Sequence, residues 1–197
     1  MVYLRQLEAL ETYAKENHVP IMMPEGINFL TNYIKEYQCY RILEIGAAIG
    51  YSAIKMALVD PSVHVTTIER DEKRYEEALK NIEAFHLENQ ITLILGDALE
   101  TEITGTYDLI FIDAAKSQYI KFFNRYQENL DANGVIISDN LDFHGLTHTK
   151  EKIASRNVRQ LVRKINNYIT FLKENDEFDT TFFSLGDGIG VSKRRQI

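Results

Sequence analysis

Two predicted strands of this 197-residue chain end in side chains that could bind a metal ion. Asp113 follows the apolar segment 109–112, and Asp139 and Asn140 follow the apolar segment 135–138. Because neighbouring parallel strands end at one edge of a sheet, we expect these side chains to lie close together. Two carboxylates and an amide oxygen suit Mg²⁺ or another hard divalent cation. A helix cap could explain any one of these residues, but their coincidence predicts a cation site.

Lys116 lies three residues after Asp113, within reach of a substrate oxygen at such a site. A divalent cation nearby lowers the pKa of a lysine, so Lys116 could act as a general base near neutral pH. Taken alone, a lysine that opens a helix is usually surface charge. We predict Lys116 and Asp113 as catalytic residues.

A glycine-containing turn earlier in the chain predicts a nucleoside cofactor. Segment 40–45 is typical of a buried strand and segment 51–59 of a helix, with Gly46 and Gly50 in the turn between them. Glu69 ends the next apolar strand, nineteen residues after Gly50, where a carboxylate can accept hydrogen bonds from both ribose hydroxyls.

The same turn favours S-adenosylmethionine over NAD. Ala48 stands where the dinucleotide fingerprint has its second glycine. Glu44 would repel a pyrophosphate but would attract a cofactor that carries a sulfonium and an ammonium group. Further along, Asp97 and Ala98 follow the strand 91–95, where an acid could meet the adenine amino group. Met22, Ser52 and Asp113 are the remaining predicted cofactor contacts, although Met22 could simply fill the core.

Length and composition indicate one domain, residues 1–197, with an N-terminal helical cap at 1–38 and a basic helical segment at 145–173. The chain contains no apolar run long enough for a membrane span and no signal peptide, so we expect a cytoplasmic protein without a membrane partner. Helical spacing predicts helices over 1–17, 24–37 and 71–85. Two further apolar strands, 180–185 and 189–192, flank a glycine-rich turn.

Charge is unevenly distributed along the chain. The net charge is −7, yet residues 145–197 carry ten Lys or Arg against six Asp or Glu. Such asymmetry can mark a local polyanion site, although a solvated helix face is the simpler interpretation. The basic side chains of one predicted helix are Arg156, Arg159, Arg163 and Lys164. Arg156, Arg159 and Arg163 share one helical face, which would suit phosphates.

Together these motifs resemble the metal-dependent catechol-type class I O-methyltransferases. The resemblance rests on Glu44-x-Gly46-x-x-x-Gly50, on Asp113-x-x-Lys116 and on Asp139-Asn140, and it extends from about His18 to Arg195. It implies a Rossmann-like α/β fold, with a seven-stranded, mostly parallel sheet, an antiparallel last strand and helices on both faces. It also implies S-adenosyl-L-methionine and Mg²⁺ as cofactors and a homodimer, for which the N-terminal helix could supply the interface.

Within that family the sequence is similar to the bacterial tRNA 5-hydroxyuridine methyltransferases. The similar segments are 18–22, 48–54, 68–70 and 111–116, although the basic run in 145–173 is thinner than that group leads us to expect. The resemblance implies methylation of 5-hydroxyuridine at the tRNA wobble position to 5-methoxyuridine. The adjacent 5-hydroxyl and 4-carbonyl oxygens of this base could chelate a cation as a catechol does. Phe143 and Tyr119 are candidates to stack on a base from the anticodon loop, although core packing explains either residue at least as well.

Three alternatives remain open from the sequence. A small-molecule catechol or phenolic O-methyltransferase would use the same catalytic residues. A module that binds S-adenosylmethionine without catalysis would need only the cofactor turn. An NAD-dependent oxidoreductase is disfavoured by Ala48 and Glu44.

Overall fold

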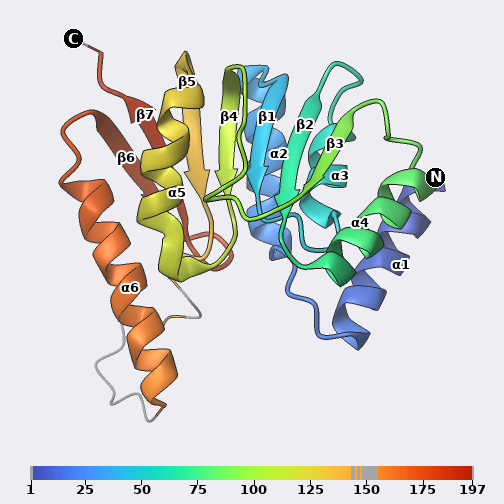
Figure 1. Cartoon of the computed structure of the whole chain (residues 1–197), viewed down its shortest axis with the longest axis horizontal. Helices are drawn as coiled ribbons and strands as arrows, with labels where there is room; N and C mark the ends of the chain where they lie inside the picture. Colours follow the sequence, from blue (N-terminus) through green and yellow to red (C-terminus); the bar gives the residue numbers. More distant parts are fainter. Residues whose placement is uncertain (1, 143–144, 146, 148–154, 197) are drawn as a thin grey trace.

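The protein is built on a seven-stranded sheet with the strand order β3-β2-β1-β4-β5-β7-β6 (Figure 1). This computed structural model describes residues 2–142, 145, 147 and 155–196. Its strands are β1 (Arg41–Ile45), β2 (His64–Glu69), β3 (Ile91–Leu95), β4 (Tyr107–Ile112), β5 (Leu130–Ser138), β6 (Phe178–Phe183) and β7 (Ile189–Arg194). Strands β1 to β5 are parallel to one another, whereas β7 runs antiparallel to both β5 and β6. The predicted mostly parallel sheet with an antiparallel last strand is confirmed.

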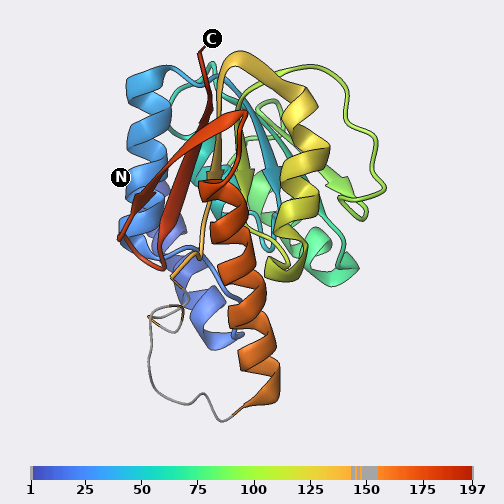
Figure 2. The same ribbon diagram turned by 90° about the vertical axis from the view of Figure 1, so that its left-hand side faces the viewer.

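Helices cover both faces of this sheet (Figures 1 and 2). They are α1 (Val2–Glu16), α2 (Pro24–Tyr37), α3 (Tyr51–Ala57), α4 (Glu72–Ala84), α5 (Tyr119–Tyr126) and α6 (Arg156–Lys173). Their starts follow local chemistry: Pro24 occupies the first turn of α2, and the side chains of Asp71 and Ser155 accept main-chain N–H groups that α4 and α6 leave unpaired. In the part of the chain that the structure describes, no helix has both the length and the apolarity needed to cross a membrane.

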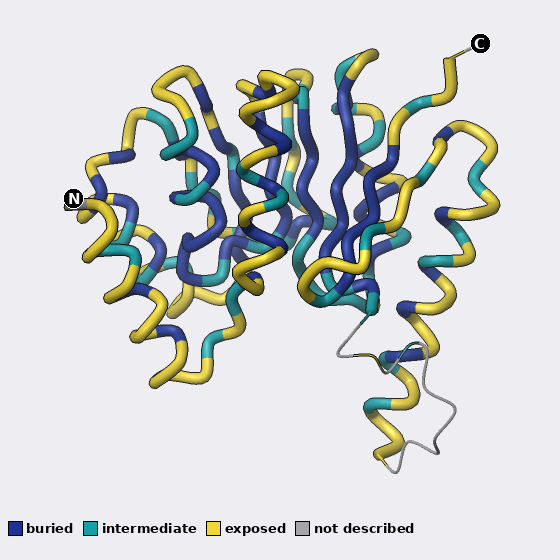
Figure 3. The backbone as a smooth tube through the Cα atoms, turned by 180° about the vertical axis from the view of Figure 1, so that it is seen from behind, coloured by how far each residue is buried: buried dark blue, intermediate teal, exposed yellow. Residues whose placement is uncertain are grey.

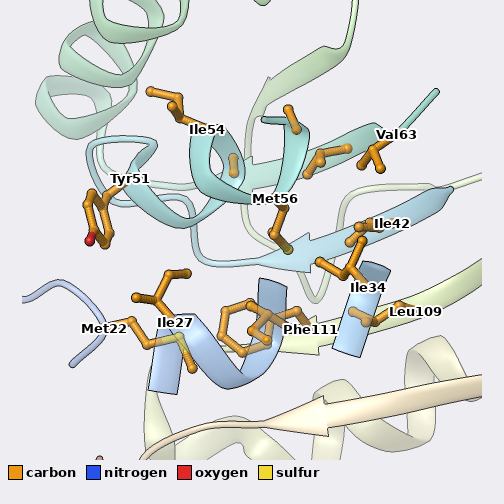
Figure 4. Packing of buried hydrophobic residues seen from close by; sticks show 14 of the residues in the cluster. Met22, Ile27, Ile34, Ile42, Tyr51, Ile54, Met56, Val63, Leu109 and Phe111 are labelled. Carbon is orange, nitrogen blue, oxygen red and sulfur yellow. The ribbon is translucent and has the colours of Figure 1, made fainter. Parts of the chain in front are cut away.

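Two hydrophobic clusters hold the helices to the sheet. One joins α1, α2 and α3 to one face, and the other joins α5 and α6 to the opposite face. The central strands are buried on both faces, as Figure 3 shows, because each parallel strand is covered by helices from two sides. At one end of the first cluster, Met22 and Tyr51 lie close to Ile27 of α2 (Figure 4). This end of the core borders the cavity described next.

Candidate active site

A cavity of about 550 Å³ opens at the carboxyl edge of the parallel strands. Nine of the residues predicted as site residues line it: Met22, Gly46, Ser52, Glu69, Asp97, Ala98, Asp113, Lys116 and Asn140. Most of the lining residues come from the ends of β1 to β5 and the loops after them and from the loop before α2, and others come from α3, α4, α5 and the turn between β6 and β7. The topology therefore brings the predicted cofactor turn and the predicted cation ligands into one space, as expected for an open α/β sheet.

Main-chain hydrogen bonds continue past the strand ends and fix these loops relative to one another. Gly46 N donates to Ile68 O at 3.0 Å, and Asp113 N donates to Ile45 O at 3.1 Å. Asp139 N donates to Ile112 O at 3.2 Å. The first residue after each of these strands thus still donates a main-chain hydrogen bond to the neighbouring parallel strand. The first residue of each site loop is consequently held as firmly as the strand before it.

Gly46 is required by its surroundings as well as by its backbone angle. Its φ is +103°, and a Cβ atom there would lie 2.3 Å from the carbonyl oxygen of Asp113. Gly50, which precedes α3, has a φ of +82° but does not line the cavity. Both glycines are at turns where other residues would be strained. Only Gly46, however, lets the cofactor turn touch the loop that carries Asp113.

Glu69 is held by main-chain donors at the end of β2. One carboxylate oxygen accepts from Ala48 N at 2.8 Å, and the other accepts from Arg70 N and Asp71 N, each at 2.9 Å. Ala48 itself has a φ of +47°, a left-handed conformation that is uncommon for alanine. The Glu69 carboxylate is therefore fixed before any ligand binds. Its oxygens retain lone pairs that could accept ribose hydroxyls.

Glu44 does not line the cavity, in contrast to the expectation that it attracts the positive end of a cofactor. It is fully buried on the α3 side of β1, and its two oxygens accept the hydroxyls of Ser52 and Thr67, each at 2.5 Å. Burial raises the pKa of Glu44 to about 7, although the two hydroxyl donors oppose this rise. Successive strand residues face opposite sides of the sheet, so Glu44 positions Ser52 from behind the turn.

Asp97 and Ala98 form the far end of the cavity, after β3. One Asp97 carboxylate oxygen accepts from Leu99 N at 2.8 Å, which closes a tight turn. The carbonyl oxygen of Ala98 accepts from the hydroxyl of Tyr126 at 2.5 Å. Asp97 is therefore bonded to the main chain and the Ala98 carbonyl to a side chain, so the turn is preformed.

Asp113, Asp139 and Asn140 lie together at the opposite end, as predicted. The Asn140 side-chain nitrogen donates to an oxygen of Asp113 at 3.1 Å and to an oxygen of Asp139 at 2.8 Å. Asn140 has a φ of +64°, a conformation that asparagine tolerates better than most residues. The amide thus lies between two carboxylates that would otherwise repel each other.

These two carboxyl groups resist ionisation. Burial, followed by the charge of Asp113, raises the pKa of Asp139 to about 8. Burial also raises the pKa of Asp113, whereas the nearby Lys116 ammonium lowers it. A positive charge between the two acids would lower the pKa of both, because it stabilises the ionised form of each carboxyl group.

The donor atoms at this end fit a hard cation. The Oδ1 atom of Asp139 is buried and has no hydrogen-bond partner, and buried polar atoms seldom remain unpaired. Within the described ranges, no three His, Cys, Asp or Glu side chains gather as a metal site. The expected ligand set instead combines two acids with an amide oxygen, for which the Asn140 amide would need to turn over.

Asp187 is a site residue that the sequence reasoning missed. It lines the cavity from the turn between β6 and β7, and its charge raises the pKa of both Asp113 and Asp139. β7 begins beside the end of β5, where Gly190 pairs with Ser138. The turn before an antiparallel last strand must therefore lie at the carboxyl edge. That topology was the signal that could have identified Asp187.

The predicted base-stacking residues and the predicted phosphate contacts do not line the cavity. Tyr119 is only 1% exposed and packs edge-on against Tyr168, so its ring is part of the core and cannot stack on a base. Phe143 lies outside the described residues. The four basic side chains of α6 that were predicted to contact phosphates are exposed: Arg156, Arg159, Arg163 and Lys164. The N-terminal part of α6 extends beyond the carboxyl edge of the sheet, on the side of the cavity (Figures 1 and 2).

Comparison with known proteins places this site in a family. The model of the O-methyltransferase family matches residues 1–195. A structure from Staphylococcus aureus, provisionally assigned as a caffeoyl-CoA O-methyltransferase, is 38% identical, with a TM-score of 0.92 over 96% of this chain and 92% of that one. An O-methyltransferase from Bacillus cereus, solved in complex with SAH, is 25% identical, with a TM-score of 0.81 over 97% and 91% of the two chains. The caffeoyl-CoA O-methyltransferase of Populus kitakamiensis is 27% identical, covering 97% of this chain and 86% of its own length. The chain therefore belongs to the O-methyltransferase family, as an S-adenosylmethionine-dependent enzyme of the caffeoyl-CoA O-methyltransferase-like type.

Proposed function

We propose that this enzyme transfers the methyl group of S-adenosylmethionine to the 5-hydroxyl of 5-hydroxyuridine in the anticodon loop of tRNA, with Mg²⁺ or a similar cation. The observation that carries the proposal is the convergence of Asp113, Asp139, Asn140 and Lys116 at one end of the cavity whose other end holds Glu69 and Asp97. A tRNA-modifying enzyme of this kind would act in the cytoplasm.

The cofactor would lie between the two ends. Glu69 would accept the ribose hydroxyls, and Asp97 would accept from the adenine amino group. Gly46 and Ser52 would border the methionine portion, with Met22 on the opposite wall. In the B. cereus relative the bound molecule is SAH, which is the demethylated form of this cofactor. Glu44 would support Ser52 from behind without a direct contact.

The cation would be held by Asp113, Asp139 and the amide oxygen of Asn140. When bound, it would act as a Lewis acid that lowers the pKa of the substrate hydroxyl. Lys116 would accept the hydroxyl proton, since it lines the cavity beside Asp113. The site would bring the substrate oxygen, once it has lost its proton, against the sulfonium methyl group, and S-adenosylhomocysteine would be the leaving group.

The preference for tRNA is supported by the exposed basic residues of α6. Arg156, Arg159 and Arg163 point from a helix that extends past the cavity edge, where phosphates flanking an extruded base could reach them. Their charge contrasts with the acidic remainder of the chain, which carries twelve Lys or Arg against 23 Asp or Glu over residues 1–144.

A small phenolic substrate is the second candidate, because two of the relatives described above are named for caffeoyl-CoA. Caffeoyl groups carry adjacent hydroxyls and would use the same cation site. Binding of S-adenosylmethionine without catalysis is disfavoured by the lysine and the two acids at the cation end.

Mass spectrometry of nucleosides tests the substrate. Hydroxyuridine-bearing tRNA is incubated with the enzyme, S-adenosylmethionine and Mg²⁺, and a parallel sample contains EDTA. We expect one added methyl on 5-hydroxyuridine, abolished by EDTA. Methylation of a free catechol at a rate that rivals tRNA would contradict the tRNA assignment and favour the phenolic substrate.

Charge reversal on α6 tests the RNA contacts. The double variant Arg156→Glu, Arg163→Glu should raise the KM for tRNA by about tenfold or more and reduce its salt dependence, because phosphate contacts are lost. Lys35→Glu on α2, which packs on the opposite face, is the matched control and should leave KM unchanged. Equal effects of the two variants would show that overall charge, and not α6, attracts tRNA.

We also propose that the enzyme is a homodimer formed through α1. Helix α1 leaves Leu4 64% exposed and Tyr13 37% exposed on its two flanks. Light scattering should give twice the monomer mass, and Leu4→Glu should give a monomer. A wild-type protein that is monomeric at micromolar concentration would contradict this assembly.

A further inference from the structure

Helix α5 lies against both ends of the cavity and is joined to each by a tyrosine. Tyr119 and Tyr126 are its first and last residues, and each is 1% exposed. The Tyr119 hydroxyl donates to the main-chain carbonyl of Asp139 at 3.2 Å. The Tyr126 hydroxyl donates to the main-chain carbonyl of Ala98 at 2.5 Å. One bond therefore reaches the cation end, and the other reaches the adenine end.

The two tyrosines share one face of the helix. They are seven residues apart, which is about two turns and about 10 Å along the axis. Phe122 lies between them on that face and lines the cavity itself. This face of α5 is thus a wall of the cavity as well as the link between its ends.

The loops that these bonds join are far apart in the sheet. Asp139 follows β5 and Ala98 follows β3, and three strands, β2, β1 and β4, lie between those two. Neither tyrosine lines the cavity, so neither would touch the cofactor or the substrate. Each hydroxyl is buried, and a buried carbonyl that loses such a donor has no water to replace it.

We propose that Tyr119 and Tyr126 are positioning residues, and that α5 is a rigid spacer that holds the cation end and the adenine end of the cavity at a fixed separation. The inference rests on the proposed cation and cofactor sites. Tyr119 positions Asp139, a cation ligand, through its main chain. Tyr126 positions Ala98, and with it the adjacent Asp97. The two hydroxyls therefore act on different ligands.

The affinities for a metal ion and for a cofactor analogue, measured separately on two variants, test whether each tyrosine acts on only one end of the cavity. Mn²⁺ binding is followed by the electron paramagnetic resonance signal of the free ion, and S-adenosylhomocysteine binding by calorimetry. Tyr119→Phe should weaken Mn²⁺ binding by about tenfold, as for other groups that orient a metal ligand, and leave the S-adenosylhomocysteine affinity within about twofold. Tyr126→Phe should show the reverse pattern, with S-adenosylhomocysteine weakened by about fivefold.

Tyr168→Phe is the matched control. Its hydroxyl is bonded to the Ser138 hydroxyl at 2.7 Å in the same aromatic cluster, and it has no bond to either site loop. This variant should lose thermal stability and should weaken either ligand by less than about twofold, because its hydroxyl is bonded within β5 and not to a carbonyl of a site loop among the described residues. Phenylalanine retains the ring in the core in every case, and thermal unfolding verifies that each variant is folded.

The outcomes separate this inference from the proposed function. Equal weakening of both ligands by either variant, or a change in Tyr168→Phe as large as that in Tyr119→Phe, would overturn the inference and leave the proposed function standing. If the unsubstituted protein did not bind Mn²⁺, this result would instead contradict the proposed cation site. It would also contradict the positioning role of Tyr119.

Discussion

The two ends of the cavity differ in how completely their polar groups are paired. At the adenine end, Glu69 accepts three main-chain N–H groups and Asp97 accepts one. At the cation end, burial and the charge of Asp113 raise the pKa of Asp139, and one Asp139 oxygen has no hydrogen-bond partner. The first end is therefore preformed for a neutral, hydrogen-bonding ligand. The second is complete only when a positive charge joins it, so the two ends should respond to different perturbations.

The largest expected effect comes from removing one acid of the cation end. Asp139→Asn keeps the shape of the side chain but removes a charge, so kcat/KM for methyl transfer should fall by about a thousandfold. The affinity for S-adenosylhomocysteine should stay within about twofold, because the adenine end is untouched. Steady-state kinetics and calorimetry check the two values. An equal loss of cofactor affinity would show that the ends are not independent.

Removal of the predicted base should have the next largest effect. Lys116→Ala should lower kcat by about a hundredfold or more, because a proton acceptor is lost. Lys116→Arg retains the charge but cannot accept a proton, so it should be nearly as slow. Activity close to wild type in Lys116→Arg would show that only the charge of Lys116 matters.

At the adenine end, Glu69→Gln should weaken S-adenosylhomocysteine by about tenfold or more, because hydrogen bonds to a charged acceptor are replaced. Mn²⁺ affinity should not change. Calorimetry and paramagnetic resonance on the same protein samples compare the two ligands. Weaker Mn²⁺ binding in this variant would contradict the separation of the two ends.

A change of a single pH unit should have the smallest of these effects, and it concerns the cation end. The pKa of Asp139 is raised to about 8, so a cation must displace a proton below that pH, and Mn²⁺ affinity should fall by about tenfold per pH unit from pH 8 to pH 6. In EDTA the folded protein binds more protons than the unfolded chain between about pH 4 and pH 8, so its stability should decrease as pH rises through this range. Asp139→Asn should flatten that slope. A pH-independent Mn²⁺ affinity would contradict the raised pKa.

The sequence predicted which strands and loops carry the site residues better than it predicted which face of the sheet each side chain occupies. Strand ends at Asp113, Asp139 and Glu69 follow from apolar runs and from the common edge of a parallel sheet. The face of the sheet to which a strand residue points depends on its position in the alternation of side chains along the strand. It also depends on the helix that packs on that face. This is why Glu44 was expected in the cavity but is buried behind it with Thr67.

Contacts between residues that are far apart in the sequence account for the other differences between the predicted site and the structure. Asp187 reaches the cation end only because β7 returns beside β5, which no local pattern reveals. Tyr119 was expected to contact substrate, yet the aromatic cluster with Tyr168 and Phe123 buries it. Which aromatic residues of α5 enter the core depends on the partner helix α6, which packs on them from a distant part of the sequence.

The contact between Gly46 and the carbonyl of Asp113 has an evolutionary consequence. Because even a methyl group at position 46 would displace the Asp113 loop, descendants of this protein cannot alter the cofactor turn there and keep the cation ligand in place. The positive φ of Gly46 adds a second constraint, because alanine would be strained there whatever lies nearby. Glycine should therefore be retained at position 46 for as long as the turn keeps its contact with the Asp113 loop.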